Sequence, residues 1–257
     1  MKDKLRQSVV VVTILVTLII NGLANALPLN GLNTGQISDR FKVYFVPAGY
    51  VFTIWGLIYL GLIAFAIFQV LGAQRENPRM RATGWWISLS GLANSAWIFL
   101  WHFQQFPLTL VAMLTLLGTL IITYLRLGIG RSVVSAAENW LVRLPFSIYL
   151  GWITVATVAN VTDVLDFLKW DGFGLDPIVW MWIMLTAVLV ITVIMIFTRH
   201  DTAYSLVILW ALAGIAFKFS TILAVATPTW ITFGLVVLSL GVAYILGRSH
   251  QNLEPVV

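Results

Sequence analysis

The chain has 257 residues, of which 60% are hydrophobic and 10% charged, and its mean hydropathy is +0.94. Soluble domains carry about 25% charged residues, so this composition excludes an ordinary soluble protein. The net charge of +5 does not indicate nucleic-acid binding, because the basic residues are spread over several short segments. Cysteine is absent, which excludes disulfides, thiolate metal sites and iron–sulfur clusters.

Eight apolar stretches are each long enough to cross a lipid bilayer, which takes about 20 mainly apolar residues. They cover residues 8–27, 49–71, 83–102, 107–126, 143–162, 177–197, 202–223 and 229–247. The sequence therefore predicts an all-α, polytopic membrane bundle of about eight transmembrane helices. The first stretch ends in Ala24-Asn25-Ala26, the outline of a signal-peptide cleavage site. We expect this stretch to be retained, because it is long for a signal and carries two asparagines, Asn21 and Asn25.

Lysine and arginine indicate the orientation, because cytoplasmic connections retain positive charge during insertion. Eleven of the 15 fall on one side, namely Lys2, Lys4, Arg6, Arg75, Arg79, Arg81, Arg126, Arg131, Arg143, Arg199 and Arg248. The other side has Arg40, Lys42 and Lys169, and Lys218 falls inside the seventh stretch. We predict an integral protein of a bacterial cytoplasmic membrane with both termini in the cytoplasm. Residues 28–48 and the acidic loop 163–176 are then outside.

Aromatic and amide side chains recur at helical spacing in the second, third and fifth stretches. The three sets are Trp55 and Tyr59; Asn94, Trp97 and Trp101; and Trp152, Ala156 and Asn160. The direction of each stretch places these sets, with Asn21 and Asn25, in the outer half of the membrane. Amides are costly against lipid, so they either hydrogen-bond between helices or line a cavity. The combined set favours a pocket for a large planar or steroidal ligand.

Three motifs in this order resemble the TspO/MBR family, the tryptophan-rich sensory proteins related to the translocator protein, or peripheral benzodiazepine receptor. The motifs are Pro47-Ala48-Gly49-Tyr50 before Trp55-Gly-Leu-Ile-Tyr59; Asn94-Ser-Ala-Trp97-Ile-Phe99; and Tyr149-Leu-Gly-Trp152 followed by Ala156-Thr157-Val-Ala-Asn160. The resemblance covers residues 8–162. The chain departs from the family in having one proline, Pro47, and in having Asp163 and Asp166 where a tryptophan and a basic residue are usual.

The resemblance implies a five-helix bundle whose pocket binds tetrapyrroles such as protoporphyrin IX or haem, and sometimes sterols or drug-like ligands. Its wall would comprise Trp55, Tyr59, Asn94, Trp97, Trp101, Trp152, Ala156 and Asn160, with Asn21, Asn25 and Lys218 as further polar candidates. Residues 1–162 would form this five-helix membrane domain, 163–176 an outer loop, and 177–257 three further helices and a cytoplasmic tail. Porphyrin or haem would be a ligand, since no cofactor is required. Relatives often dimerise, which makes a homodimer compatible with the resemblance.

Three functions are compatible with these features. The leading one is a membrane sensor or regulator that binds a tetrapyrrole or a similar hydrophobic molecule, with the lipid bilayer and that ligand as its partners. The alternatives are a carrier or permease for a hydrophobic or anionic small molecule, and a porphyrin-degrading enzyme. The sequence shows no catalytic or metal-ligand pattern, which favours a function without catalysis. Two residues remain open: Lys218 is functional or reaches the interface, and His102 is an axial haem ligand or an interfacial residue.

Overall fold

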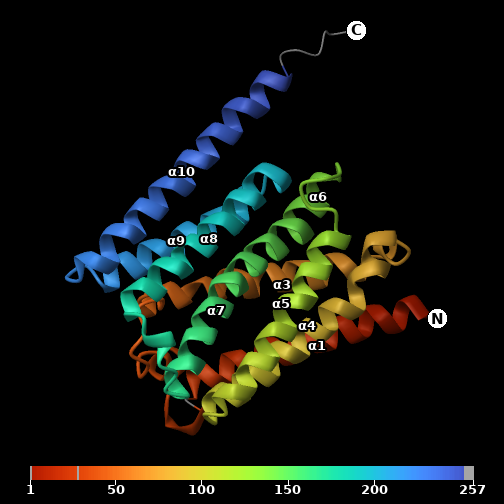
Figure 1. Cartoon of the computed structure of the whole chain (residues 1–257). Coiled ribbons are helices and arrows are strands. Elements are labelled where there is room, and N and C mark those ends of the chain that lie inside the picture. Colours follow the sequence, from red (N-terminus) through yellow and green to blue (C-terminus); the bar gives the residue numbers. More distant parts are fainter. Residues whose placement is uncertain (1, 28, 252–257) are drawn as a thin grey trace.

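Helices make up most of the chain, as a computed structural model of the protein shows. The structure describes residues 2–27 and 29–251, without the side chains of Asn25 and residues 247–251. The long helices in this part are α1 (Lys2–Ala26), α3 (Ile54–Val70), α4 (Pro78–His102), α5 (Phe106–Arg126), α7 (Leu144–Phe167), α8 (Pro177–Arg199), α9 (Thr202–Lys218) and α10 (Leu223–Gln251) (Figure 1). Each predicted stretch corresponds to one of them, so the prediction of an all-α polytopic bundle is confirmed.

Among the described residues, six helical segments are long and apolar enough to cross a membrane. They contain α3, α5, α7 and α8 and most of α1 and α10. Of the other two long helices, α9 is apolar but has only 17 residues, and α4 has 25 residues with many polar side chains on its buried side. Burial of that polar side inside the bundle removes it from lipid, which allows a less apolar helix at membrane depth.

Short helical segments lie in the connections. The first loop contains α2 (Thr34–Ser38) and leads through a 3-10 turn, Gly49–Thr53, into α3. The loop before α7 contains α6 (Ala136–Glu138) and a π turn, Asn139–Arg143. Proline occupies the first turn of α4, α5, α7 and α8, where its missing N–H costs no helical hydrogen bond.

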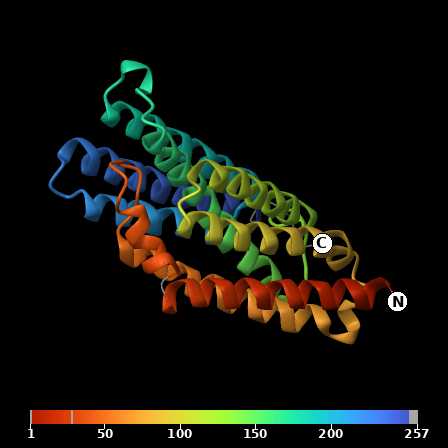
Figure 2. The same cartoon turned by 90° about the horizontal axis from the view of Figure 1, so that it is seen from below.

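Five helices form a ring in which α1 contacts α3, α3 contacts α7, α7 contacts α5, α5 contacts α4, and α4 returns to α1. The remaining helices lie outside this ring, with α9 packed on α7 and both α8 and α10 packed on α9. Figure 1 shows α7 between the α1, α4 and α5 side of the molecule and the α8 to α10 side. In Figure 2 the first loop, in orange, and the α7–α8 loop, in teal, lie at the end of the bundle opposite the start of α1.

Close backbone approach joins α9 to the ring. The Ala48 amide donates to the carbonyl of Gly214 at 3.3 Å, and Trp210 Nε1 donates to the carbonyl of Val51 at 3.1 Å. A Cβ atom on Gly214 would lie only 2.1 Å from Val51 Cγ2. At the other end of α9, the hydroxyl of Tyr124 donates to Asp201 Oδ2 at 2.8 Å. The added helices are therefore attached to the ring at both ends of α9.

Replacing Gly214 with leucine should destabilise the protein, because a side chain there must displace the turn that precedes α3. We expect a loss of about 1–3 kcal/mol in the free energy of unfolding, the usual cost of overpacking. Thermal unfolding of the purified protein in detergent measures this loss. Gly234→Leu is the matched control, because no atom lies within 4 Å of a Cβ at that position. Equal midpoints for the two variants would contradict the contact.

Candidate ligand pocket

Two asparagines join α1 to α4 inside the ring. Asn21 is 1% exposed and Asn94 is 0% exposed, and Asn21 Nδ2 donates to Asn94 Oδ1 at 2.7 Å. One turn earlier, Thr17 Oγ1 donates to the carbonyl of Gly91 at 3.1 Å. A Cβ on Gly91 would lie 2.8 Å from Thr17 Oγ1, so glycine at this position permits the close approach of α1 and α4. Asn21 and Asn94 therefore form a hydrogen bond between helices, which is one of the two arrangements that the sequence allowed.

The aromatic residues of α4 contact an amide on α7. The rings of Trp97 and Trp101 are stacked, with centroids 5.1 Å apart and planes at 18°. Trp97 Nε1 donates to Asn160 Oδ1 at 3.3 Å, and Asn160 Nδ2 donates to Thr109 Oγ1 on α5 at 2.9 Å. Asn160 therefore links three helices and holds the face of Trp97 in place.

A second aromatic group lies between α3 and α7. Trp55 stacks on Tyr59 with centroids 5.6 Å apart, and its ring meets Trp152 edge to face at 6.2 Å. Phe52, in the turn before α3, also meets Trp152 edge to face, at 5.6 Å. Such edge-to-face pairs restrain the rings in fixed orientations, so the aromatic residues of both helices form a continuous wall.

The predicted pocket residues divide between two neighbouring hollows. The inner hollow has a volume of about 40 Å³ and is lined by Trp97, Trp101, Trp152, Ala156 and Asn160, among others. The wider hollow, of about 460 Å³, is lined by Asn21, Trp55 and Tyr59 among others, and is not enclosed. Asn94 lines neither hollow, but it accepts a hydrogen bond from Asn21, which lines the wider one. The sequence predicted one cavity, and the structure divides it into two.

Phe52 and Thr34 line both hollows, so they lie at the partition between them. Thr34 begins α2, and hydrogen bonds hold it in place: Trp101 Nε1 donates to its carbonyl at 3.2 Å, and its hydroxyl lies 3.2 Å from His102 Nε2. Pockets for drug-sized ligands have volumes of about 300–1,000 Å³, which the wider hollow supplies and the inner hollow alone does not. A ligand that also enters the inner hollow must displace Phe52 or α2 and join the two hollows.

Sequence reasoning missed the roles of Phe52, Thr34 and Asp163 in these hollows. Asp163 was expected in the acidic loop, but α7 continues to Phe167, so the carboxyl group lies on the helix and lines the inner hollow. It is 2% exposed, and its Oδ1 has no hydrogen-bond partner among the described residues. Its position three residues after Asn160 could have revealed the shared face, because residues three apart are neighbours on a helix.

Lys218 lines neither hollow, but its ion-pair partner lines the wider one. Its Nζ is 2.6 Å from Asp39 Oδ1, just after α2, so the ion pair joins α9 to the first loop. The sequence placed Lys218 inside a span, whereas α9 ends at this residue, so the lysine lies at a helix end. Asn25 was a further candidate, but its side chain lies outside the described part of the chain.

His102 is buried at the end of α4, and both ring nitrogens have partners. Nδ1 lies 3.1 Å from the carbonyl of Leu29, while Nε2 faces Thr34 as described above. Asn30 Nδ2 also donates to the carbonyl of His102 at 3.0 Å. The histidine therefore holds the first loop against α4, and iron coordination would require one of its two ring contacts to break.

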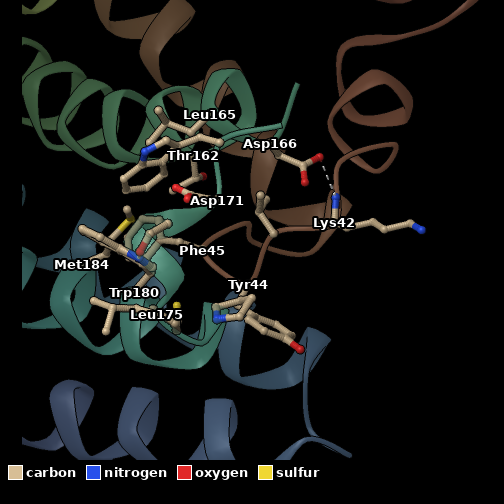
Figure 3. Close-up of a pocket in the computed structure, with 15 residues that line it drawn as sticks. Lys42, Tyr44, Phe45, Thr162, Leu165, Asp166, Asp171, Leu175, Trp180 and Met184 are labelled. Carbon is tan, nitrogen blue, oxygen red and sulfur yellow. Dashed lines mark hydrogen bonds between the residues drawn. The ribbon is translucent and has the colours of Figure 1, made fainter. Parts of the chain in front are cut away.

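A third hollow, of about 150 Å³, lies near the C-terminal end of α7, between the first loop and the start of α8 (Figure 3). Two of its walls are Trp170 and Trp180, whose ring centroids are 4.9 Å apart. Asp166 Oδ2 accepts a hydrogen bond from the backbone amide of Lys42 at 3.3 Å, and Figure 3 shows the lysine side chain extending away. Asp163 and Asp166, one turn apart on α7, therefore line different hollows.

The Asn21–Asn94 contact should contribute measurably to stability, because neither amide can find water at this depth. A double-mutant cycle of Asn21→Ala and Asn94→Ala should give a coupling energy of about 0.6–2 kcal/mol, the usual range for such contacts in membranes. Thermal unfolding in detergent gives the four free energies. Asn21→Ala combined with Asn160→Ala is the control, and should be additive within about 0.5 kcal/mol. Additivity in both pairs would contradict the assigned contact.

A family model described as TSPO-like protein matches residues 7–242 of the chain. This match confirms the resemblance noted in the sequence and extends it, since it continues past residue 162 through α8 and α9 and into α10. The three helices beyond the five-helix resemblance thus fall within the matched region, α10 in part. Neither the curated proteins nor the solved structures include a match to the chain.

Proposed function

The chain belongs to the TSPO-like family, and we propose that it is a membrane sensor that binds a flat hydrophobic ligand between α3, α4 and α7. The convergence of the indole rings of Trp55, Trp97, Trp101 and Trp152 supports this proposal, because aromatic walls with few polar groups suit such ligands. Tetrapyrroles are the first ligands to test, since the family resemblance implies them. No step of chemistry is required of the protein in this role.

Access to the pocket is from the loop end of the bundle. On the ring's outer surface, α9 contacts both α7 and the turn before α3, and so covers the side of the wall formed by Trp152 and Phe52. The wider hollow opens beside α2, whose contacts to α4 are the hydrogen bonds of Thr34 with Trp101 and His102. Displacement of this five-residue helix breaks those hydrogen bonds and uncovers Ile37, which is buried, but it leaves the long helices in place. We therefore propose that α2 and Phe52 move when a ligand binds.

We further propose that the loop end faces away from the cytoplasm and that both termini are cytoplasmic, as the distribution of basic residues indicates. Because the chain has no cysteine, single cysteines report the orientation directly. Phe173→Cys, at a position 79% exposed in the α7–α8 loop, should react with a membrane-impermeant maleimide on intact cells. Val133→Cys, at a position 98% exposed at the other end, should react only after permeabilisation. The reverse pattern would contradict the orientation.

Protoporphyrin IX should bind the purified protein in detergent, and loss of a wall residue should weaken binding. We expect Trp152→Ala to lower the affinity about tenfold, equivalent to about 1.4 kcal/mol, because an edge-to-face aromatic wall is lost. The absorption spectrum of the porphyrin measures binding without depending on the number of tryptophans. Trp140→Ala is the control, since Trp140 is 65% exposed and remote from the hollows.

Unchanged affinity in the double variant Trp152→Ala, Asn94→Ala would show that the porphyrin binds elsewhere. The same absorption measurement under illumination distinguishes binding from degradation, since a degrading enzyme bleaches the bound porphyrin. A stable spectrum under light supports the sensor over the enzyme.

A further inference from the structure

Asp163 is a buried acid without a partner in the wall of the inner hollow. It is 2% exposed, and its Oδ1 accepts no hydrogen bond from the described residues. An isolated buried carboxylate is unfavourable by several kcal/mol, and buried charges in proteins are normally paired. Intramembrane acids accordingly mark places where a charged or polar group binds. Asp163 is therefore a candidate to pair with a charged or polar group.

The charged side chains of the neighbouring segments have other positions or partners. Lys218 pairs with Asp39 at 2.6 Å, and the side chain of Lys42 extends away from the third hollow in Figure 3. Asp166 lies one turn further along α7 and has the same sign of charge as Asp163. No described cation forms an ion pair with Asp163. The protein therefore leaves this acid available to a group from outside.

The rest of the inner hollow is suited to a positive charge. Trp97, Trp101 and Trp152 line it together with Asp163. The face of an indole ring is electron-rich and attracts cations, most strongly where water is excluded. A volume of about 40 Å³ has room for about three waters, which suits an ammonium group carrying few substituents. A carboxylate would face both Asp163 and the ring faces, and would be repelled.

A second unpaired atom points to the rest of the ligand. Trp152 Nε1 is buried without an acceptor among the described residues. An indole N–H only donates, whereas a carboxylate only accepts. A ligand with a protonated amine and a nearby acceptor, such as a ring nitrogen or a carbonyl oxygen, would satisfy both atoms. Its flat body would extend past Phe52 into the wider hollow.

We propose that the inner hollow binds the cationic nitrogen of a flat aromatic amine, with Asp163 as the counter-ion and Trp97, Trp101 and Trp152 as the walls. This inference rests on the proposed function, because it names the chemical class of the ligand for the same pocket. A ligand that carries carboxylates, such as a free porphyrin, must place them outside the inner hollow.

Two acridines with the same ring system test the proposal on the full-length protein in detergent. 9-(Aminomethyl)acridine carries a protonated primary amine at neutral pH and keeps its ring nitrogen as an acceptor, whereas acridine-9-carboxylate is an anion. We expect the amine to bind the native protein at least tenfold more tightly, as measured from the fluorescence of each probe. Asp163→Asn keeps the size of the side chain and removes its charge, so it should abolish this preference. Asp166→Asn makes the same change of charge in the third hollow (Figure 3) and should retain it.

Equal affinities of the two probes for the native protein would overturn the proposal, as would a preference that survives Asp163→Asn. If that variant does not fold, thermal unfolding of the native protein decides, because the amine must raise the midpoint more than the carboxylate does. Binding of protoporphyrin IX that depends on Trp152, without binding of the amine, would overturn this inference and leave the proposed function intact. Failure of all three ligands to bind would overturn both.

Discussion

The absence of water at membrane depth is the constraint on which the rest of this structure depends. Amides inside the ring are most stable with partners in the protein. Among the described residues, Asn94 Nδ2 has no partner, but Asn21 Nδ2 donates to Asn94 Oδ1, and Asn160 Oδ1 accepts from Trp97 Nε1. These contacts cross between α1, α4, α5 and α7, so they also set how the helices approach each other. The aromatic walls stand where they do because the amides hold their helices in this arrangement.

The helix α7 serves two functions at once, because its opposite faces meet different parts of the protein. One face presents Trp152 and Asn160 to the interior of the ring. Another presents Gly151, where a Cβ would lie 3.0 Å from the carbonyl of Tyr204 on α9. The added helices thus pack against the same element that forms the pocket wall. Both α7 and the turn containing Val51 therefore contact α9 and also contribute to the wall.

Parts of the candidate site could be predicted from the sequence, and the parts that could not depend on contacts between distant segments. Helical spacing was enough to place Trp97 beside Trp101, and Trp152 on the face of Asn160, because residues three or four apart are neighbours on any helix. The position of Phe52 between the two hollows was not predictable, since it depends on how the first loop folds over α3 and α7. Asp163 was assigned to a loop because the end of a helix is poorly marked when no glycine or proline follows.

Sequence by itself determined the number of helices and their amphipathic faces, because hydropathy over about 20 residues and helical periodicity are local properties. Tertiary structure alone decided that α9 covers α7, that Lys218 pairs with Asp39 across 179 residues, and that the predicted pocket is divided in two. The physical reason is that these outcomes depend on which helical faces meet. Several arrangements satisfy the same hydropathy pattern, and only side-chain packing and buried hydrogen bonds distinguish between them.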